Sequence, residues 1–213
     1  MEDVRRYFDR VAPEWDNMRQ GFFTEEVRDE VLRRVQPRPE MRVVDVGCGT
    51  GFLAEGLAGL VAQVHCVDTS ARMLEQAREH LASHRNVSFH LCVGTDLPMA
   101  EDSVEAVVAC MYLHHVSDPP EALREMARIL RPGGRLVLAD LDEHGEEWMR
   151  AEMADVWLGF SRPTIREWME KAGLEEVGVE CCGQNCCADR PEGGRAAISI
   201  FIAEGKKGTR SIP

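Results

Sequence analysis

The chain has 213 residues, of which 44% are hydrophobic and 29% are charged, values typical of a single globular domain. Its 37 acidic and 25 basic side chains give a formal net charge of −12, which disfavours a nucleic-acid partner because a phosphate backbone repels so acidic a chain. The N-terminal segment MEDVRRYFDRVAPEWD lacks an apolar signal region, and no run approaches the roughly 18 apolar residues of a membrane span. We therefore expect a cytoplasmic protein.

The first section of the chain predicts two helices. Asp3–Val11 and roughly Thr24–Val35 have helical composition, and Pro13 and Gly21 are expected to break the chain between them. Two acidic residues directly after Thr24 make it a plausible helix start.

From residue 41 onward, short apolar runs alternate with helical segments. The expected strands are Arg42–Val46, Val61–Val67, Val87–Val93, Val104–Cys110 and Arg135–Asp140. The expected helices are Phe52–Leu60, Ala71–Ser83 and Pro119–Leu130. This alternation, with nearly continuous apolar strands, predicts an α/β fold in which a parallel sheet is covered by helices on both faces.

The alternation of strands and helices ends in the last third of the chain. Two helices, Glu143–Asp155 and Pro163–Ala172, are expected before the strands Glu175–Cys182 and Arg195–Ala203. With no long helix between them, these two strands are expected to form an antiparallel hairpin at one edge of the sheet. The result is a seven-stranded, mostly parallel sheet whose last strand is antiparallel.

The strongest local pattern is VVDVGCGTG at residues 43–51. The strand delivers Asp45, and a helix follows the turn. The turn contains three alternate glycines, Gly47, Gly49 and Gly51. Glycines let a ligand approach the backbone, and free N–H groups at the helix start favour a polar or negative ligand group. A dinucleotide fingerprint would need glycine where Phe52 stands, and a P-loop would need a lysine, so neither pattern fits.

Three further strand ends carry polar or aromatic side chains. Asp68 ends the second strand, where a carboxylate can accept both hydroxyls of a ribose, and Ser70 is better placed to cap the next helix. The third strand ends in Gly94-Thr95-Asp96, and the fourth runs from Cys110 into Tyr-Leu-His-His. Because the carboxyl ends of parallel strands meet at one edge of a sheet, we expect a single ligand crevice there.

These residues closely resemble the class I S-adenosyl-L-methionine-dependent methyltransferases. The resemblance is carried by VVDVGCGTG (43–51), VDTSARML (67–74) and DLPMAEDSVEAVVACMYLHHVSDPPEALREMARILRPGGRLVLAD (96–140). Within that superfamily, the segment from Tyr7 to Asp16 resembles the N-terminal part of ubiquinone/menaquinone-biosynthesis C-methyltransferases, which folds over the cofactor. The stretches 140–144 and 155–160 are more similar to methyltransferases associated with arsenic-resistance-type regulators.

The resemblance implies a Rossmann-like fold in one methyltransferase domain, 1–213. Residues 1–39 would form an N-terminal helical lid, 40–141 the cofactor-binding core, and 142–205 the substrate-side helices and the terminal hairpin. Tyr7 and Trp15 would belong to the lid on the substrate side, with Trp15 standing where the family commonly has tyrosine.

The resemblance also implies contacts with S-adenosyl-L-methionine. The implied cofactor-binding residues are Asp45, Gly47, Cys48, Gly49, Thr50, Gly51, Asp68, Thr69, Met73, Thr95, Asp96, Leu97 and Cys110. Asp45 and the glycines would hold the methionine portion, and Asp68 would hold the ribose. Thr69 and Met73 would lie near the adenine. Thr95 and Asp96 stay alternatives at the adenine edge, because the acidic segment usual before Leu-Pro is shortened here.

Two histidines are candidate general bases. Methyl transfer from a sulfonium needs mainly alignment and desolvation, so a catalytic side chain need not exist. If a base is needed, His114 or His115 can supply it, since imidazole titrates near neutral pH. The alternative is a structural turn in which one histidine packs and the other caps the helix at Pro119, and we favour a structural role for at least one of them.

The eight cysteines fall into two groups. Cys48, Cys66, Cys92 and Cys110 stand apart in apolar runs and are expected in the core. The others crowd at the expected turn of the terminal hairpin: Cys181, Cys182, Cys186 and Cys187. Thiolates there would suit zinc, copper(I) or an arsenite-type metalloid. The alternative is small strand residues and reduced surface thiols, because adjacent cysteines on a strand point to opposite faces.

Two classes of function follow. The first is an enzyme that methylates a small molecule, quinone-like or another carbon, oxygen or sulfur nucleophile, and releases S-adenosyl-L-homocysteine; methylation of a thiophilic metalloid is its alternative. The second is a cofactor-binding metalloid sensor without chemistry. In either case we expect a monomer or homodimer with a small-molecule ligand.

Overall fold

The computed structural model describes residues 2–208, so Met1 and residues 209–213 lie outside the part discussed below. Seven strands form one sheet in the order β3-β2-β1-β4-β5-β7-β6. The strands are β1 (Arg42–Val46), β2 (Gln63–Asp68), β3 (Val87–Leu91), β4 (Val104–Cys110), β5 (Leu130–Leu141), β6 (Leu174–Asp189) and β7 (Arg195–Lys207).

The pairing confirms the predicted sheet. β1 pairs in parallel with β2 and β4, and the parallel pairing continues outward to β3 and β5. β7 lies between β5 and β6 and is antiparallel to both. β1 and β4 are buried along nearly their whole length, which explains why they read as continuous apolar runs.

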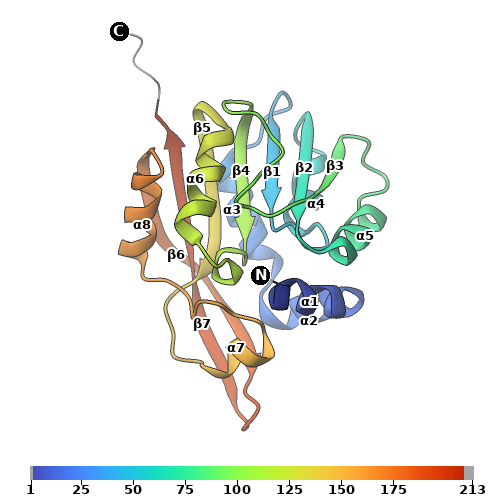
Figure 1. The fold of residues 1–213 in the computed structure, drawn as a ribbon, viewed down its shortest axis with the longest axis vertical. Coiled ribbons are helices and arrows are strands. Elements are labelled where there is room, and N and C mark those ends of the chain that lie inside the picture. Colours follow the sequence, from blue (N-terminus) through green and yellow to red (C-terminus); the bar gives the residue numbers. More distant parts are fainter. Residues whose placement is uncertain (1, 209–213) are drawn as a thin grey trace.

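Helices cover both faces of the sheet (Figure 1). The helices of the structure are α1 (Glu2–Val11), α2 (Trp15–Phe22), α3 (Glu25–Val35), α4 (Phe52–Ala58), α5 (Ala71–His80), α6 (Pro119–Ile129), α7 (Trp148–Glu152) and α8 (Arg162–Lys171). One hydrophobic cluster joins α3, α4 and α5 to one face, and a second joins α6 and α8 to the other. No helix within residues 2–208 is long and apolar enough to cross a membrane.

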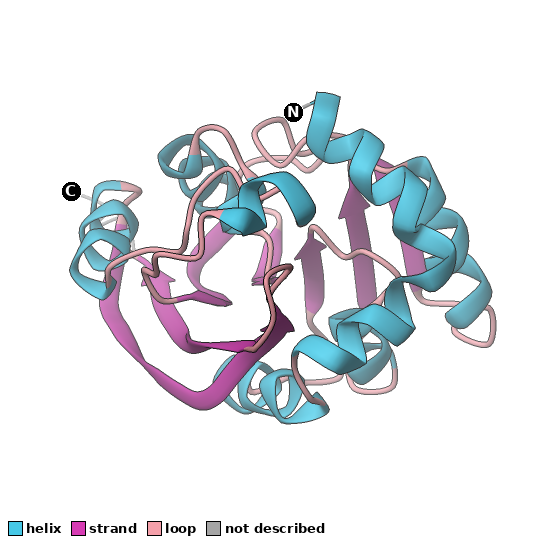
Figure 2. Cartoon of the chain, turned by 90° about the horizontal axis from the view of Figure 1, so that it is seen from below, coloured by secondary structure: helices cyan, strands magenta, loops and turns pink. Residues whose placement is uncertain are grey.

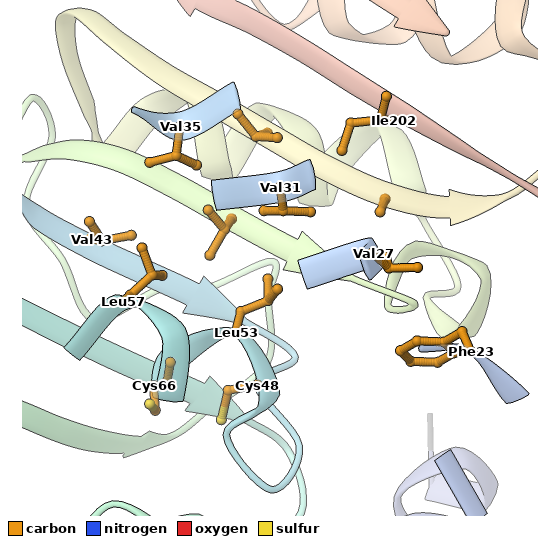
Figure 3. Close-up of a cluster of buried hydrophobic side chains, with 14 of the residues drawn as sticks. Phe23, Val27, Val31, Val35, Val43, Cys48, Leu53, Leu57, Cys66 and Ile202 are labelled. Carbon is orange, nitrogen blue, oxygen red and sulfur yellow. The ribbon is translucent and has the colours of Figure 1, made fainter. Parts of the chain in front are cut away.

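The spacing of apolar residues explains how α3 docks on the sheet. Val27, Val31 and Val35 recur every four residues, so they share one helix face, and all three have no exposed surface. Figure 3 shows this valine stripe beside Leu53 and Leu57 of α4. Full burial of such a side chain contributes roughly 1.5–3 kcal/mol, so the stripe fixes α3 against the strands.

The N-terminal section is more helical than predicted. The chain passes from α1 through a short 3₁₀ turn, Ala12–Glu14, directly into α2. Pro13 stands in the first turn of that segment, where its missing N–H breaks no hydrogen bond, so it redirects the chain without ending the helical region. In Figure 1, α1 and α2 lie across the end of the sheet toward which β1 and β2 point.

The predicted helix Glu143–Asp155 is wrong for most of its length, because only α7 is helical there. The amides of Glu143 and His144 donate to the carbonyls of Phe160 and Leu158, at 3.0 Å each. These two amides therefore donate to residues 158 and 160, where the chain runs back alongside, and are not available for hydrogen bonds within a helix. Ala154, with φ of 61°, follows the helix in a left-handed conformation that stops it.

The terminal hairpin is longer than predicted, and its turn lies elsewhere. β6 continues through the cysteine cluster to Asp189, with a register shift between Cys181 and Asn185. The turn falls at residues 190–194, where Gly193 and Gly194 have φ values of 98° and 88°. Such values favour glycine strongly, which fixes the turn after the cysteines.

Candidate active site

A cavity of about 500 Å³ opens at the carboxyl ends of β1, β2, β3 and β4, where the sequence predicts a ligand crevice. The N-terminal helices supply its outer wall, and Figure 2 shows these helices in front of the strand ends when the molecule is seen from below. Predicted site residues in its lining are Asp45, Gly47, Cys48, Gly49, Asp68, Thr69, Met73, Thr95, Cys110, Trp15 and His115.

The glycine turn follows β1 and forms the floor of this cavity. The amides of Gly47 and Cys48 both donate to the carbonyl of Val67, at 2.8 and 3.0 Å, which fastens the turn to β2. Gly47 has φ of 70°, and a Cβ there would overlap the ring of Tyr112. Glycine is therefore required both by the backbone conformation and by the close approach of Tyr112, in the loop after β4.

Asp68 connects the second strand end to the glycine turn. One carboxylate oxygen accepts the amide of Gly49 at 2.9 Å, and the other accepts the amide of Ser70 at 2.8 Å. Burial raises the pKa of Asp68, while these backbone donors lower it. A carboxylate has acceptor positions beyond those that these two amides use, so Asp68 can still accept a hydroxyl group from the cavity.

Asp45 lies under the same turn and is only 1% exposed. Its carboxylate accepts the amide of Ala54, in the first turn of α4, at 3.2 Å. Burial raises the pKa of Asp45 to about 7 despite this hydrogen bond, and the neighbouring Asp68 charge adds to the effect. A cationic ligand group in the cavity would favour the ionised form of this carboxyl.

Two hydrogen bonds attach the N-terminal helices to the cavity. The hydroxyl of Ser70, which caps α5 as predicted, donates to Asp9 at 2.7 Å. The hydroxyl of Thr50 donates to Asp16 at 2.6 Å, so the glycine turn holds the start of α2. We call these two hydrogen bonds the lid contacts. They join α1 to the start of α5 and α2 to the glycine turn, just outside the cavity lining.

The comparison with known proteins agrees with this geometry. A family model described as a methyltransferase domain matches residues 44–138, the stretch that contains the glycine turn, Asp68 and the fourth strand. The chain belongs to the class I S-adenosylmethionine-dependent methyltransferases.

Individual relatives of this methyltransferase include quinone-pathway proteins. The chain is 34% identical over 154 residues to "Ubiquinone biosynthesis O-methyltransferase" of Thiobacillus denitrificans, covering 70% of this chain and 66% of the relative. It is 29% identical to "Demethylmenaquinone methyltransferase" of Renibacterium salmoninarum, covering 96% and 94%. The matches to the first three curated relatives span only 45%, 66% and 46% of those proteins.

A solved structure shares the whole fold of this methyltransferase. The "putative methyltransferase" in complex with the Trm112 activator of Haloferax volcanii superposes with a TM-score of 0.77. The identity is 21%, and the match covers 95% of this chain and 98% of the neighbour. At this identity the likeness concerns the fold alone.

Several residues that the resemblance implies as cofactor ligands lie outside the cavity lining of this methyltransferase. Thr50 uses its hydroxyl in a lid contact, and Gly51 precedes the first turn of α4. Of the two alternatives at the third strand end, Thr95 lines the cavity and Asp96 is exposed. Leu97 is buried, and its amide donates to Glu125 at 2.8 Å.

The two histidines of the methyltransferase have different surroundings. His114 is buried, and its Nδ1 lies 2.6 Å from Asp140. Burial lowers the pKa of His114, but the Asp140 and Asp155 carboxylates outweigh burial and raise it. His115 lines the cavity, and burial together with the nearby His114 lowers its pKa far below the ordinary value, which keeps it neutral. The alternative that a histidine caps α6 is wrong, because Asp118 accepts the amide of Glu121.

A second, smaller cavity of about 40 Å³ adjoins the first behind the lid. The two share several wall residues, including Phe8, Trp15 and His115. Tyr7 lines only the smaller cavity, where its hydroxyl lies 3.8 Å from the sulfur of Met153. The ring of Phe8 meets those of Trp15 and His115 edge-on, at centroid distances of 5.4 and 4.9 Å. The resulting chamber is walled largely by aromatic rings and methionines.

The four clustered cysteines do not converge on one point. Cys181 is exposed and Cys186 is buried in the wall of the smaller cavity, because β6 carries them on opposite sides of the bulge. Within residues 2–208, the one group of three or more histidine, cysteine or acidic side chains close enough to hold a metal contains no cysteine. The four thiols therefore do not form a metal site in this structure, and the predicted thiolate site stays a prediction. Among the dispersed cysteines, Cys48 and Cys66 are buried as predicted, and Cys92 and Cys110 are partly buried.

Arg19 is the functional candidate that sequence reasoning missed. It is only 6% exposed, yet it lines the main cavity from α2. Its guanidinium lies 4.3 Å from the ring centroid of Phe52 and 3.1 Å from a carboxylate oxygen of Glu25. A buried cation in the wall of the cavity can bind a carboxylate of the ligand.

Proposed function

We propose that this protein transfers the methyl group of S-adenosylmethionine to a small-molecule acceptor, a quinone-like compound or another carbon, oxygen or sulfur nucleophile. One observation carries the proposal: the 500 Å³ cavity joins the glycine turn, the Asp68 carboxylate and an aromatic lid at the carboxyl end of a parallel sheet. The quinone-pathway relatives support this acceptor class.

The residues of the cavity fit the cofactor in charge and shape. Asp68 would accept the two ribose hydroxyls, with Thr69 and Met73 beside the adenine. Asp45 would lie near the cationic amino group, and Arg19 would bind the carboxylate of the methionine portion. The glycine turn leaves space where side chains would block the ligand.

The chain's own contribution to the reaction is alignment, exclusion of water and acceptance of a proton. The cofactor supplies a methyl group on a sulfonium that is already activated for transfer. Aromatic side chains of the lid, Phe8 and Trp15, would separate the reacting atoms from solvent. His115 is neutral, and its Nδ1 lies 3.1 Å from the carbonyl of Ala154, so its Nε2 can accept a proton from the acceptor.

We also propose that the chain is one cytoplasmic methyltransferase domain that works as a monomer or homodimer. The seven strands form one continuous sheet, and the two hydrophobic clusters on its faces span the lid, the core and the terminal hairpin, which supports a single unit. Size-exclusion chromatography with light scattering would measure the oligomeric state directly.

Calorimetric titration with S-adenosylmethionine and S-adenosylhomocysteine tests cofactor binding. We expect micromolar-range binding by the wild type and a loss of at least about 100-fold in Asp68→Ala, because charge-assisted hydrogen bonds of roughly 1.5–3 kcal/mol each disappear. Asp29→Ala is the matched control, since this exposed carboxylate on α3 lies outside the cavity lining. Equal effects of the two variants, or no binding by the wild type, would overturn the proposed site.

Turnover needs a separate test, because binding alone fits a cofactor-binding module without chemistry. The acceptor screen starts with hydroquinones and catechols, followed by thiols and arsenite, and measures S-adenosylhomocysteine release. Methylation of a hydroquinone supports the proposal. Tight cofactor binding without product on any acceptor would identify a module that has lost methyl transfer.

A further inference from the structure

Three side chains converge behind the lid in the wall of the smaller cavity. His114 Nε2 and His115 Nδ1 lie 3.8 and 3.9 Å from the same carboxylate oxygen of Asp155. In the described part of the chain, they form the one set of metal-ligating side chains whose ligand atoms all lie within 4.8 Å of one another. Distances near 3.8 Å are too long for direct hydrogen bonds, so the three groups face one another without satisfying one another.

In this arrangement the Asp155 carboxylate lacks a hydrogen-bond partner within residues 2–208 for one of its oxygens. Its side chain is 2% exposed, and its second carboxylate oxygen is buried without a hydrogen-bond partner among the described residues. Burying an acceptor without a partner costs roughly 1–3 kcal/mol, and more for a charged group. The residue also lines the smaller cavity, so the orphaned carboxylate borders a space that can hold a ligand atom.

The surroundings of His114 orient its ring toward Asp155. Nδ1 lies 2.6 Å from Asp140, whose other oxygen accepts the amide of Leu113 at 2.7 Å. Nδ1 therefore carries the proton, and the lone pair of Nε2 points to the side where Asp155 lies. A carboxylate that holds the distant nitrogen of a histidine in this way is the usual support of a metal-ligating imidazole.

We propose that His114, His115 and Asp155 together bind one divalent transition-metal cation of the Zn²⁺ class. Two imidazoles and one carboxylate are a donor set that such cations prefer. Tetrahedral bonds of about 2.1 Å place ligand atoms roughly 3.4 Å apart, so the two distances from the histidines to Asp155 need to contract by about half an ångström, and no pair of ligand atoms is more than 4.8 Å apart. The cation takes Nδ1 of His115, whose proton moves to Nε2 as the contact with the Ala154 carbonyl is given up.

The position of the site suggests its use. The ligand atoms border the chamber that adjoins the cofactor cavity, so a remaining coordination position can take an oxygen, nitrogen or sulfur atom of the acceptor. This use rests on the proposed methyl transfer and makes His115 a ligand in place of a proton acceptor. Binding of the cation itself does not depend on that activity.

The test measures Zn²⁺ binding to the full-length, metal-stripped protein by competition with a chromophoric chelator. We expect one equivalent to bind, and Asp155→Asn and His114→Gln to weaken binding by about tenfold or more. The matched control is the double variant His65→Gln/His90→Gln, which removes a histidine pair 3.3 Å apart on β2 and β3 and should leave the affinity unchanged. No binding by the wild type, or equal binding by all variants, would overturn the proposal.

Spectroscopy of the wild type distinguishes metal binding at this site from metal binding by the cysteines, and it needs no variant. Co²⁺ bound by histidine and carboxylate lacks the thiolate charge-transfer band, and X-ray absorption of the Zn²⁺ form should show only nitrogen and oxygen ligands. Sulfur in the coordination shell would refute the assignment and point to Cys186 or its neighbours. Cofactor titration of the same variants without metal keeps the two proposals apart, since intact cofactor binding with no metal binding removes only this inference.

Discussion

At the residue scale, the charge of Asp45 links stability to pH. Burial raises its pKa from the ordinary 3.8 to about 7, so between these values the folded protein holds a proton that the unfolded chain releases. The free energy of unfolding therefore falls as pH rises through this window, by about 1.4 kcal/mol per unit. Urea denaturation of Asp45→Asn should show a flatter dependence from pH 4 to 7 and a relative gain in stability at pH 8. A dependence as steep as that of the wild type would contradict this account.

Arg19 permits an equally sharp test of ligand recognition. Arg19→Gln should weaken S-adenosylhomocysteine binding at least about tenfold, because a charge-assisted hydrogen bond contributes 1.5–3 kcal/mol. Binding of 5′-methylthioadenosine, which lacks the carboxylate, should not change. Arg28→Gln is the control: Arg28 contacts the same Phe52 ring, at 5.3 Å, but does not line the cavity. Equal losses for both ligands would indicate a structural role for Arg19.

Sequence reasoning finds some of these residues and misses others for a physical reason. Gly47 and Asp68 are predictable because a strand end and its turn fix their positions locally. Arg19 and Asp155 carry no local pattern, since each reaches its cavity only when a distant segment folds over the sheet. From the sequence alone, a charged residue in an amphipathic helix, such as Arg19, cannot be told apart from one on the solvent-exposed face.

At the element scale, we expect the lid contacts to set how firmly α1 and α2 hold a bound cofactor. The double variant Asp9→Ala/Asp16→Ala removes both hydrogen bonds and should increase the dissociation rate of S-adenosylhomocysteine by about tenfold or more. Glu14→Ala is the control, because that exposed side chain accepts a hydrogen bond from Asn17 of the same helical segment. Stopped-flow displacement gives the rates. An unchanged rate in the double variant would show that these two hydrogen bonds do not hold the N-terminal helices over the ligand.

α4 ties the glycine turn to the core. Leu57 has no exposed surface, so Leu57→Ala should lower the free energy of unfolding by about 2–5 kcal/mol through lost burial and the cavity it leaves. Leu60→Ala, at a position 46% exposed just beyond the same helix, should cost under about 1 kcal/mol. Urea denaturation measures both. Similar losses would mean that Leu60 is buried in solution.

At the scale of the whole molecule, the central strands are far more predictable from the sequence than the terminal hairpin and the loop around α7. β1 and β4 are read directly from their apolar runs, because strands buried on both faces need hydrophobic residues throughout. The extra length of β6 is hidden by its polar, glycine-containing sequence, which resembles a turn. The loop around α7 is likewise set by backbone pairing with a distant segment, which no helical periodicity records.

The shared wall of the two cavities has a kinetic consequence. Because the two cavities share Phe8, Trp15 and His115 in their walls, we expect an acceptor bound between them to hinder entry and release of the cofactor. Turnover should therefore be ordered, with S-adenosylmethionine first on and S-adenosylhomocysteine last off, and excess acceptor should trap the product complex. Product inhibition by S-adenosylhomocysteine would be competitive with S-adenosylmethionine alone, whereas a random mechanism would also make it competitive with the acceptor. With the proposed methyl transfer, the N-terminal helices would therefore set the order in which cofactor and acceptor bind and leave.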